Sequence, residues 1–362
     1  MFRKHTKMVA VTVIASAMLL SGCGLFGGEE ATKEIDPPQN VTYTDENIDK
    51  LAEGEAKEVS DKKVNDEKAV ETVKSELYLI DENGLVVPYA VDLPKTESIA
   101  KESLEYLVVG GPVTNILPNG FRAVLPADTQ VLGVNIKDDG TAIADFSPEF
   151  KDYKKEDEER ILQSITWTLT QFDSVKKVKI WVNGHEQKEM PVNGTPIQDG
   201  ISRMDGINYD TSDVVDITNT QPLTVYYLAE TGGKAYHVPV TKRISNEQND
   251  PIVAAVDELV KGPESTGLLS DFQNGVKLLG APKYEDGKVT LDFNESIYGS
   301  HDEEKKMISS NVLKSIVLTL TEQEGVESVN ITVNGKSDLV KEDGKKLDKP
   351  VTRPQNVNTG SF

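Results

Sequence analysis

The residue types that could carry out catalysis are few and widely spaced in this chain. The four histidines are His5, His185, His237 and His301, and no two of them are close in sequence. The chain has no His-Glu-x-x-His, no Gly-x-Ser-x-Gly, no phosphate loop and no Gly-x-Gly-x-x-Gly. The sequence therefore predicts no catalytic residue, no metal site and no cofactor. The lack of paired histidines and metal ligands also disfavours a cell-wall hydrolase or amidase.

Two aspartates, Asp145 and Asp292, stand before a phenylalanine at corresponding places in the two halves of the chain. They could form a cation site or supply a general base. The favoured interpretation is structural, with each carboxylate near a strand end and bound to turn or helix-start amides. The acidic runs 156–159 and 302–304 favour a helix start, because negative charges there interact favourably with the positive end of the helix dipole. No loop has the ligand spacing of a calcium site.

The single cysteine, Cys23, follows a segment typical of exported proteins. Three basic residues (Arg3, Lys4, Lys7) precede an apolar run over 8–20, which is too short to span a bilayer as a helix. Leu20-Ser21-Gly22-Cys23 then resembles the lipobox cut by lipoprotein signal peptidase. We expect cleavage before Cys23 and a diacylglycerol with palmitate-type chains on its thiol, because two acyl chains anchor a protein firmly. The alternative is a buried free cysteine behind an ordinary signal; one cysteine allows no intramolecular disulfide.

The acidic charge of the chain limits its partners. The formal net charge is −21, and removing residues 1–22 with their three basic side chains gives −21 − 3 = −24. Such a protein is repelled by nucleic acids and anionic headgroups, so we expect no nucleic-acid partner and membrane contact only through the lipid on Cys23. Residues 23–75 are polar and nearly free of aromatics, which predicts a mostly disordered tether that spans roughly 40 Å.

An internal repeat organises the rest of the chain. Residues 162–170 align with 313–321, and residues 178–184 align with 329–335, both at a shift of 151. Asp-Gly pairs and the tails Ile201-Ser202-Arg203 and Val351-Thr352-Arg353 also correspond. We predict a first domain over 76–208, a linker over 209–222, a second domain over 223–358 and a tail over 359–362.

Hydrophobic periodicity predicts the same elements in both copies. In the first copy we expect a helix over 97–109 capped by Thr96, then a strand with Leu132, Val134 and Ile136 on one face. A second strand places Ala142, Ala144 and Phe146 on one face, and a long helix buries the stripe that includes Ile161, Ile165 and Leu169. A last strand ends at an Asn-Gly turn, and in the second copy Pro251–Lys261 forms the first helix. An α+β fold follows, with an antiparallel sheet and two helices on one face of it.

The two tryptophans have different predicted roles. Trp167 lies in the long helix and is expected in the core, whereas Trp181 alternates with inward residues and should face away from it. Trp181 and its counterpart Thr332 are therefore candidate interface residues, although packing of Trp181 within the chain is favoured.

The lipobox, the acidic tether and the two repeats with Gly-Pro, Asp-Gly, Asp-Phe and Val-Asn-Gly resemble spore-germination lipoproteins with tandem GerMN domains. The resemblance implies an αββαβ core similar to a ring-building motif and no catalytic motif. It also implies a role in sporulation and germination, in the intermembrane space of the developing spore. There such lipoproteins support an envelope-spanning complex and have septal-channel proteins as partners.

Two function classes remain open on the sequence alone. The leading one is a non-enzymatic assembly protein that acts through protein surfaces, with a homo-oligomeric ring compatible with head-to-tail contacts. The other is a solute-binding lipoprotein that holds a ligand in a polar cleft between the two repeats.

Overall fold

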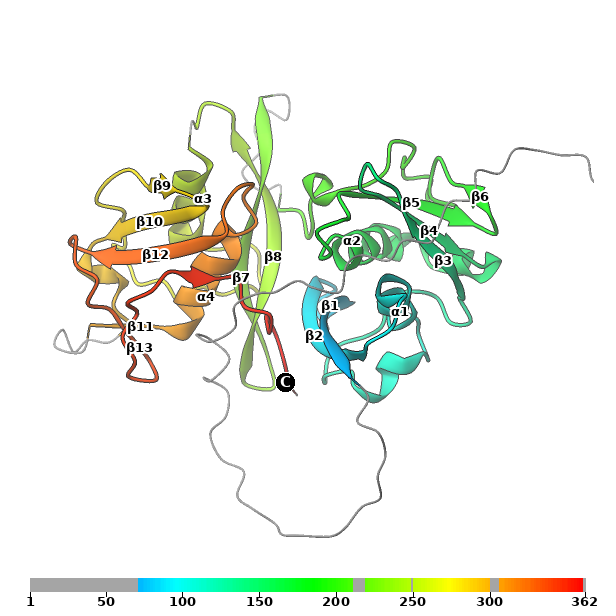
Figure 1. The fold of residues 1–362 in the computed structure, drawn as a ribbon, viewed down its shortest axis with the longest axis horizontal. Coiled ribbons are helices and arrows are strands. Elements are labelled where there is room, and N and C mark those ends of the chain that lie inside the picture. The colour runs from blue at the N-terminus through cyan, green and yellow to red at the C-terminus, as the bar shows by residue number, and fades with distance from the viewer. Residues whose placement is uncertain (1–70, 211–218, 249, 300–305, 361–362) are drawn as a thin grey trace, which may run out of the picture. The chain divides into compact units, whose positions relative to one another are not determined.

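A computed structural model describes residues 71–210, 219–248, 250–299 and 306–360, which belong to one compact unit. Figure 1 shows two copies of one α+β domain, as the sequence predicts. The first copy contains β1 (Thr72–Ile80), β2 (Val86–Pro94), α1 (Ile99–Glu105), β3 (Val131–Ile136), β4 (Thr141–Phe146), α2 (Glu158–Leu169), β5 (Lys177–Val182) and β6 (His185–Glu186). The second contains β7 (Thr220–Thr231), β8 (Lys234–Ser245), α3 (Pro251–Lys261), β9 (Lys283–Glu285), β10 (Lys288–Phe293), β11 (Met307–Ile308), α4 (Ser310–Leu320), β12 (Ser328–Val333), β13 (Val340–Lys341) and β14 (Val351–Thr352).

Cys23, the signal segment and the tether up to residue 70 lie outside the described residues, as do His301 and the acidic run 302–304. Among the helices that are described, none is both long and apolar enough to cross a membrane.

The main sheet of each copy is mixed, which corrects the antiparallel sheet expected from the sequence. In the first copy the strand order is β3-β4-β5-β6, and β4 pairs with β5 in parallel. In the second copy the order is β14-β12-β10-β9, and β10 pairs with β12 in parallel. The physical reason is the helix between these strands: α2 or α4 carries the chain back along the sheet, so the next strand enters in the same direction.

The predicted apolar faces form the core of each copy. Ala142, Ala144 and Phe146 on β4 are fully buried, and so are Ile161 and Ile165 on α2. Helix α2 contacts both α1 and β5, and α1 contacts β3, so the helices pack together against the sheet. Burial of these stripes is the main stabilising contribution.

Helix α1 is shorter than predicted. It begins after Ser98 rather than Thr96, and the Thr96 hydroxyl instead hydrogen-bonds the Glu102 carboxylate at 2.9 Å. It ends at Glu105 because the chain then turns so that Val108 can form a bridge with Leu125. In contrast, α3 has the predicted bounds, with the Asp250 carboxylate accepting from the first helical amides.

Leu132 lies on the exposed face of its strand, so its predicted place on the buried face is wrong. The register between β3 and β4 shifts between Val131 and Gly133, as at a β-bulge, and one extra residue reverses the alternation. Val131 is therefore buried, and Leu132 is 45% exposed. Val134 and Ile136, beyond the bulge, face the core as predicted.

Candidate functional site: the groove between the two repeats

The recurring aspartates have a structural role. Both Asp145 oxygens accept from the Gly184 amide, at 3.0 and 3.1 Å. Asp292 accepts from the Gly335 amide at 2.8 Å and from the Thr332 hydroxyl at 2.8 Å. Each carboxylate thus holds the Asn-Gly turn that follows the neighbouring strand, which confirms the structural interpretation.

The two candidate interface residues lie on separate sheets, Trp181 on β5 and Thr332 on β12. Trp181 is half-buried and shares its face with Lys177 and Lys179, away from the core, as predicted. Its indole nitrogen is buried and has no hydrogen-bond partner among the described residues. Trp167 is 1% exposed, which confirms its predicted place in the core.

A different pair of residues, Asn208 and Asn358, joins the two repeats. The side-chain oxygen of Asn208 accepts from the Val86 amide at 2.8 Å. Its amide nitrogen donates to the Val86 carbonyl at 2.7 Å and to the Pro239 carbonyl, in the other repeat, at 2.8 Å. Asn208 thus connects β2 of its own repeat with β8 of the second.

Asn358 makes the corresponding contacts, and here the second repeat is its own and the first repeat is the other. It accepts from the His237 amide and donates to the carbonyls of His237 and Pro88, all at 2.8 Å. At the shift of 151, His237 corresponds to Val86 and Pro239 to Pro88. The bonding is therefore symmetric about a local two-fold axis, and the tail of each repeat binds the hairpin of the other.

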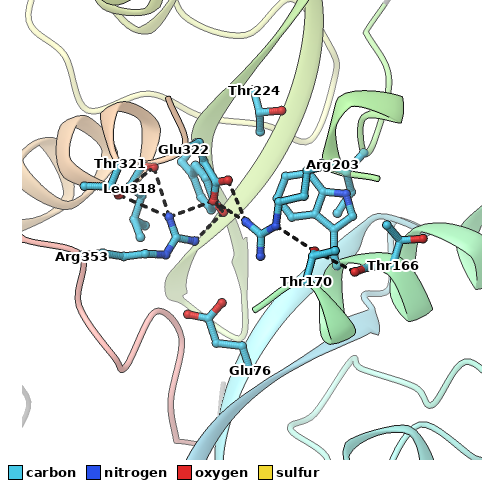
Figure 2. A network of polar contacts seen from close by, with 12 residues as sticks. Glu76, Thr166, Thr170, Arg203, Thr224, Leu318, Thr321, Glu322 and Arg353 are labelled. Carbon is cyan, nitrogen blue, oxygen red and sulfur yellow. Dashed lines mark hydrogen bonds and ion pairs between the residues drawn. The ribbon is translucent and has the colours of Figure 1, made fainter. Parts of the chain in front are cut away.

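A buried charge network lies beside these tails, and Figure 2 shows its geometry. Glu322, which follows α4, accepts a hydrogen bond from Arg203 of the first repeat at 2.7 Å and forms an ion pair with Arg353 of the second at 2.8 Å. The Glu322 side chain is 7% exposed. Burial alone would raise its pKa, but the charges of Arg203 and Arg353 outweigh burial and lower the pKa to about 2.

Each arginine is positioned by an aromatic ring and a threonine. The Arg203 guanidinium stands 4.3 Å from the centroid of the Trp167 ring, and its Nε donates to the Thr170 hydroxyl at 2.9 Å. Arg353 stands 5.4 Å from the Tyr226 ring centroid and donates to the Tyr226 hydroxyl at 2.8 Å. These contacts fix both cations over one shared carboxylate.

The position that corresponds to Glu322 in the first repeat is occupied by Gln171, and it makes different contacts. Its side-chain oxygen accepts from the Glu76 amide at 2.7 Å, and its nitrogen donates to the Glu76 carbonyl at 2.9 Å. The Glu76 carboxylate itself has one long bond, from the Tyr78 hydroxyl at 3.4 Å. Burial raises the pKa of Glu76 despite the opposing charges of Arg353 and Arg203.

These residues surround a groove of about 850 Å³ between the two repeats. Its lining includes Glu76, Arg203, Glu322 and Arg353, together with residues 72–75 of β1 and the loop 323–327 after α4. The sequence suggests a cleft between the repeats only as an alternative and does not indicate its residues, because Arg203 and Glu322 are 119 residues apart. The available signal was the correspondence of the tails that contain Arg203 and Arg353.

No group of three or more histidine, cysteine, aspartate or glutamate side chains in the described part of the chain is placed to hold a metal ion. Within the groove, the Glu322 carboxylate is instead held by Arg203, Arg353 and the Tyr226 hydroxyl.

Comparison with known proteins identifies the protein family. The family model described as "Germane: Sporulation and spore germination" matches residues 76–188 and 224–338, and the chain belongs to this family. The spore germination protein GerM of Bacillus subtilis (strain 168) is 60% identical over 367 residues, which cover 100% of both chains. The solved structure of the tandem GerMN domains of the sporulation protein GerM from Bacillus subtilis is 65% identical. It covers 80% of this chain and 100% of its own, with a TM-score of 0.75.

Proposed function

We propose that this protein acts in sporulation and germination as a non-enzymatic lipoprotein, held outside the cytoplasm by a lipid on Cys23. The observation that carries the proposal is the full-length relation to a spore germination protein, at 60% identity over the entire chain. The lipobox supports the anchor, because the small residues Ser21 and Gly22 directly precede Cys23 at the end of the apolar run.

In this proposal the protein supports assembly of the envelope-spanning complex between mother cell and forespore, in the space between their membranes. The two repeats are joined through tails that bond both hairpins, and the septal-channel proteins are the proposed partners of this unit. Assembly into a homo-oligomeric ring through the αββαβ core is the finer version of the same proposal.

The proposal is tested in Bacillus subtilis that lacks its own GerM and expresses this chain. We expect the wild-type chain to restore germination, to incorporate labelled palmitate and to co-purify with septal-channel proteins from sporulating cells. Cys23→Ala should accumulate without label and restore little germination. Full restoration by an unlabelled Cys23→Ala protein, or free distribution of the wild type in all membranes, would refute the anchored role.

A second candidate function, binding of a small solute between the repeats, is favoured by one observation. The groove is lined by both polar and apolar side chains and has a volume of about 850 Å³, which is in the range of ligand sites. A shift of the melting temperature on screening amino acids, sugars and polyamines would support it, and an unchanged melting curve would oppose it.

A further inference from the structure

One edge of the hairpin strand β1 is open where it borders the groove. The amides of Glu76, Tyr78 and Ile80 point away from β2 and are bonded by Gln171 Oε1, Thr168 Oγ1 and the Arg122 carbonyl. Because a strand repeats every two residues, the amides of Lys74 and Thr72 point the same way.

Thr72 and Lys74 are exposed and line the groove, and in the described part of the chain their backbone groups bond nothing on that side. The side chain of Gln171 binds both backbone groups of Glu76 and so ends the open stretch. The open edge is therefore a short segment, Thr72–Lys74, of the kind that pairs with an added strand.

The second repeat has closed the corresponding edge. The Tyr226 amide donates to the Thr319 hydroxyl at 2.9 Å, as the Tyr78 amide does to the Thr168 hydroxyl at 3.1 Å. These matched bonds align the first strands of the two hairpins, β1 and β7, at a shift of 148, so Lys74 corresponds to Pro222. Proline has no amide hydrogen and blocks strand addition.

A second observation marks the same place as a binding site. Ser75, directly after the open segment, is 2% exposed and lines the groove. Its hydroxyl is buried and has no hydrogen-bond partner among the described residues. The corresponding residue in the second repeat is Leu223, whose side chain has no hydrogen-bonding group. An unpaired buried hydroxyl costs stability, and a polar occupant of the groove would give this one a partner.

The rim of the groove is acidic. Its exposed carboxylates are Asp92, Asp173, Glu324 and Glu327. Lys74 is the one lysine in the lining, and its ammonium lies 3.6 Å from Asp92. The two arginines of the lining are both bound to Glu322. The rim therefore attracts a basic occupant.

We propose that this groove binds an extended, basic peptide segment of a partner protein, which adds to β1 at Thr72–Lys74 and directs lysine or arginine side chains to the acidic rim. The proposal deepens the proposed function by naming a surface for a partner. Because it is tested with purified protein, its failure can be distinguished from failure of the cellular role.

The test uses the full chain and a fluorescein-labelled probe, Gly-Val-Lys-Val-Lys-Val-Gly, in a fluorescence anisotropy titration. We expect saturable binding by the wild type. A probe with both lysines replaced by glutamate, or with alternate peptide nitrogens methylated, should bind at least roughly tenfold more weakly, because it loses charge or main-chain pairing. Equal binding of either altered probe would overturn the proposal.

Lys74→Pro tests the open edge directly. The variant should fold, because Pro222 occupies the same position in the second repeat, and unchanged circular dichroism and melting temperature verify this. Its affinity for the probe should fall roughly tenfold, since the amide donor is lost. Binding equal to that of the wild type would exclude strand addition at β1. If Lys74→Pro is destabilised, Lys74→Gln is measured instead. This variant removes the Lys74 charge and keeps the backbone amide, so its affinity for the probe should not fall.

Charge at the rim is tested with a matched pair of variants. Glu324→Gln with Glu327→Gln should weaken binding several-fold and reduce its salt dependence. Glu189→Gln with Asp348→Asn makes the same change of charge at exposed positions outside the groove lining and should leave binding unchanged. Equal losses in both pairs, or displacement of the probe by an equal concentration of free lysine, would overturn the proposal.

Discussion

The two repeats share their joining contacts but differ where they face the groove. Asn208 and Asn358 make corresponding bonds about the local two-fold axis. At the groove, the first repeat has Gln171 where the second has Glu322. Lys74 likewise stands where the second repeat has Pro222.

This difference teaches that cohesion and recognition are carried by separate residues. The symmetric bonds bury backbone-like polar groups and hold the repeats together, which any pair of identical domains could do. The residues that differ pair both arginines with one carboxylate, Glu322, and leave the edge of β1 open. The two repeats therefore contribute different chemistry to the groove between them.

The largest expected effect comes from removing the carboxylate that the two arginines share. Glu322→Ala should lower the free energy of unfolding by about 3–5 kcal/mol, because it removes the carboxylate that two largely buried guanidiniums share. Gln171→Ala, at the corresponding position, should cost about 1–2 kcal/mol, since it loses neutral hydrogen bonds only. Urea unfolding measures both. Equal losses would show that the two positions are equivalent.

The next effect concerns a buried histidine that has no counterpart in the first repeat. Burial and the charge of Lys314 lower the pKa of His237 from 6.5 to about 4. The unfolded chain therefore takes up the proton first, and the stability that this group contributes is complete above pH 6.5 and lost as the pH falls to about 4.

His237→Val places the residue found at position 86 and should flatten this part of the pH profile by about 3 kcal/mol. The measurement is the difference in unfolding free energy between wild type and variant at several pH values. Parallel profiles from pH 7 to pH 4 would mean that His237 has the same pKa in the folded and the unfolded chain.

The symmetric contacts should give similar, smaller effects. Asn208→Ala and Asn358→Ala each remove a bridge between β2 and β8 and should cost about 2 kcal/mol each. Asn358 is 4% exposed and Asn208 is half-buried, so the loss at Asn358 should be the larger. Thermal unfolding followed by circular dichroism measures both. A loss at only one position would show that the two-fold bonding is not what joins the repeats.

The smallest effect is expected at the predicted surface pair. Trp181→Thr, which installs the residue type of position 332, should change stability by no more than about 1 kcal/mol, because the side chain lies on the outer face of its sheet. Acrylamide should quench the fluorescence of Trp181 and spare the buried Trp167. A loss of stability comparable to that of Glu322→Ala would assign Trp181 to the core instead.

Much of the fold could be predicted because it depends on local sequence patterns, and these patterns occur in both repeats. The bounds of α3, the buried face of β4 and the Asp-bound Asn-Gly turns all follow from period and turn chemistry. The parallel pairing of β4 with β5, the early end of α1 and the exposure of Leu132 depend on tertiary pairing and a bulge, which composition and period do not encode.

The residues that line the groove could not be named from the sequence for the same reason. Its main contact, Arg203 to Glu322, spans the two repeats, and no local motif indicates which residues two domains will bring together. The corresponding arginines and asparagines of the two tails were visible in the alignment of the repeats. Their shared role appears only once the tails are seen to exchange between hairpins.

The most direct test of the central claim, that the open edge of the first repeat is the working surface, is made in Bacillus subtilis that lacks its own GerM. Wild-type and Lys74→Pro chains would be expressed at equal levels and the germination of the resulting spores counted. The account predicts restoration by the wild type and failure of Lys74→Pro despite normal accumulation. Equal restoration by both chains would contradict it.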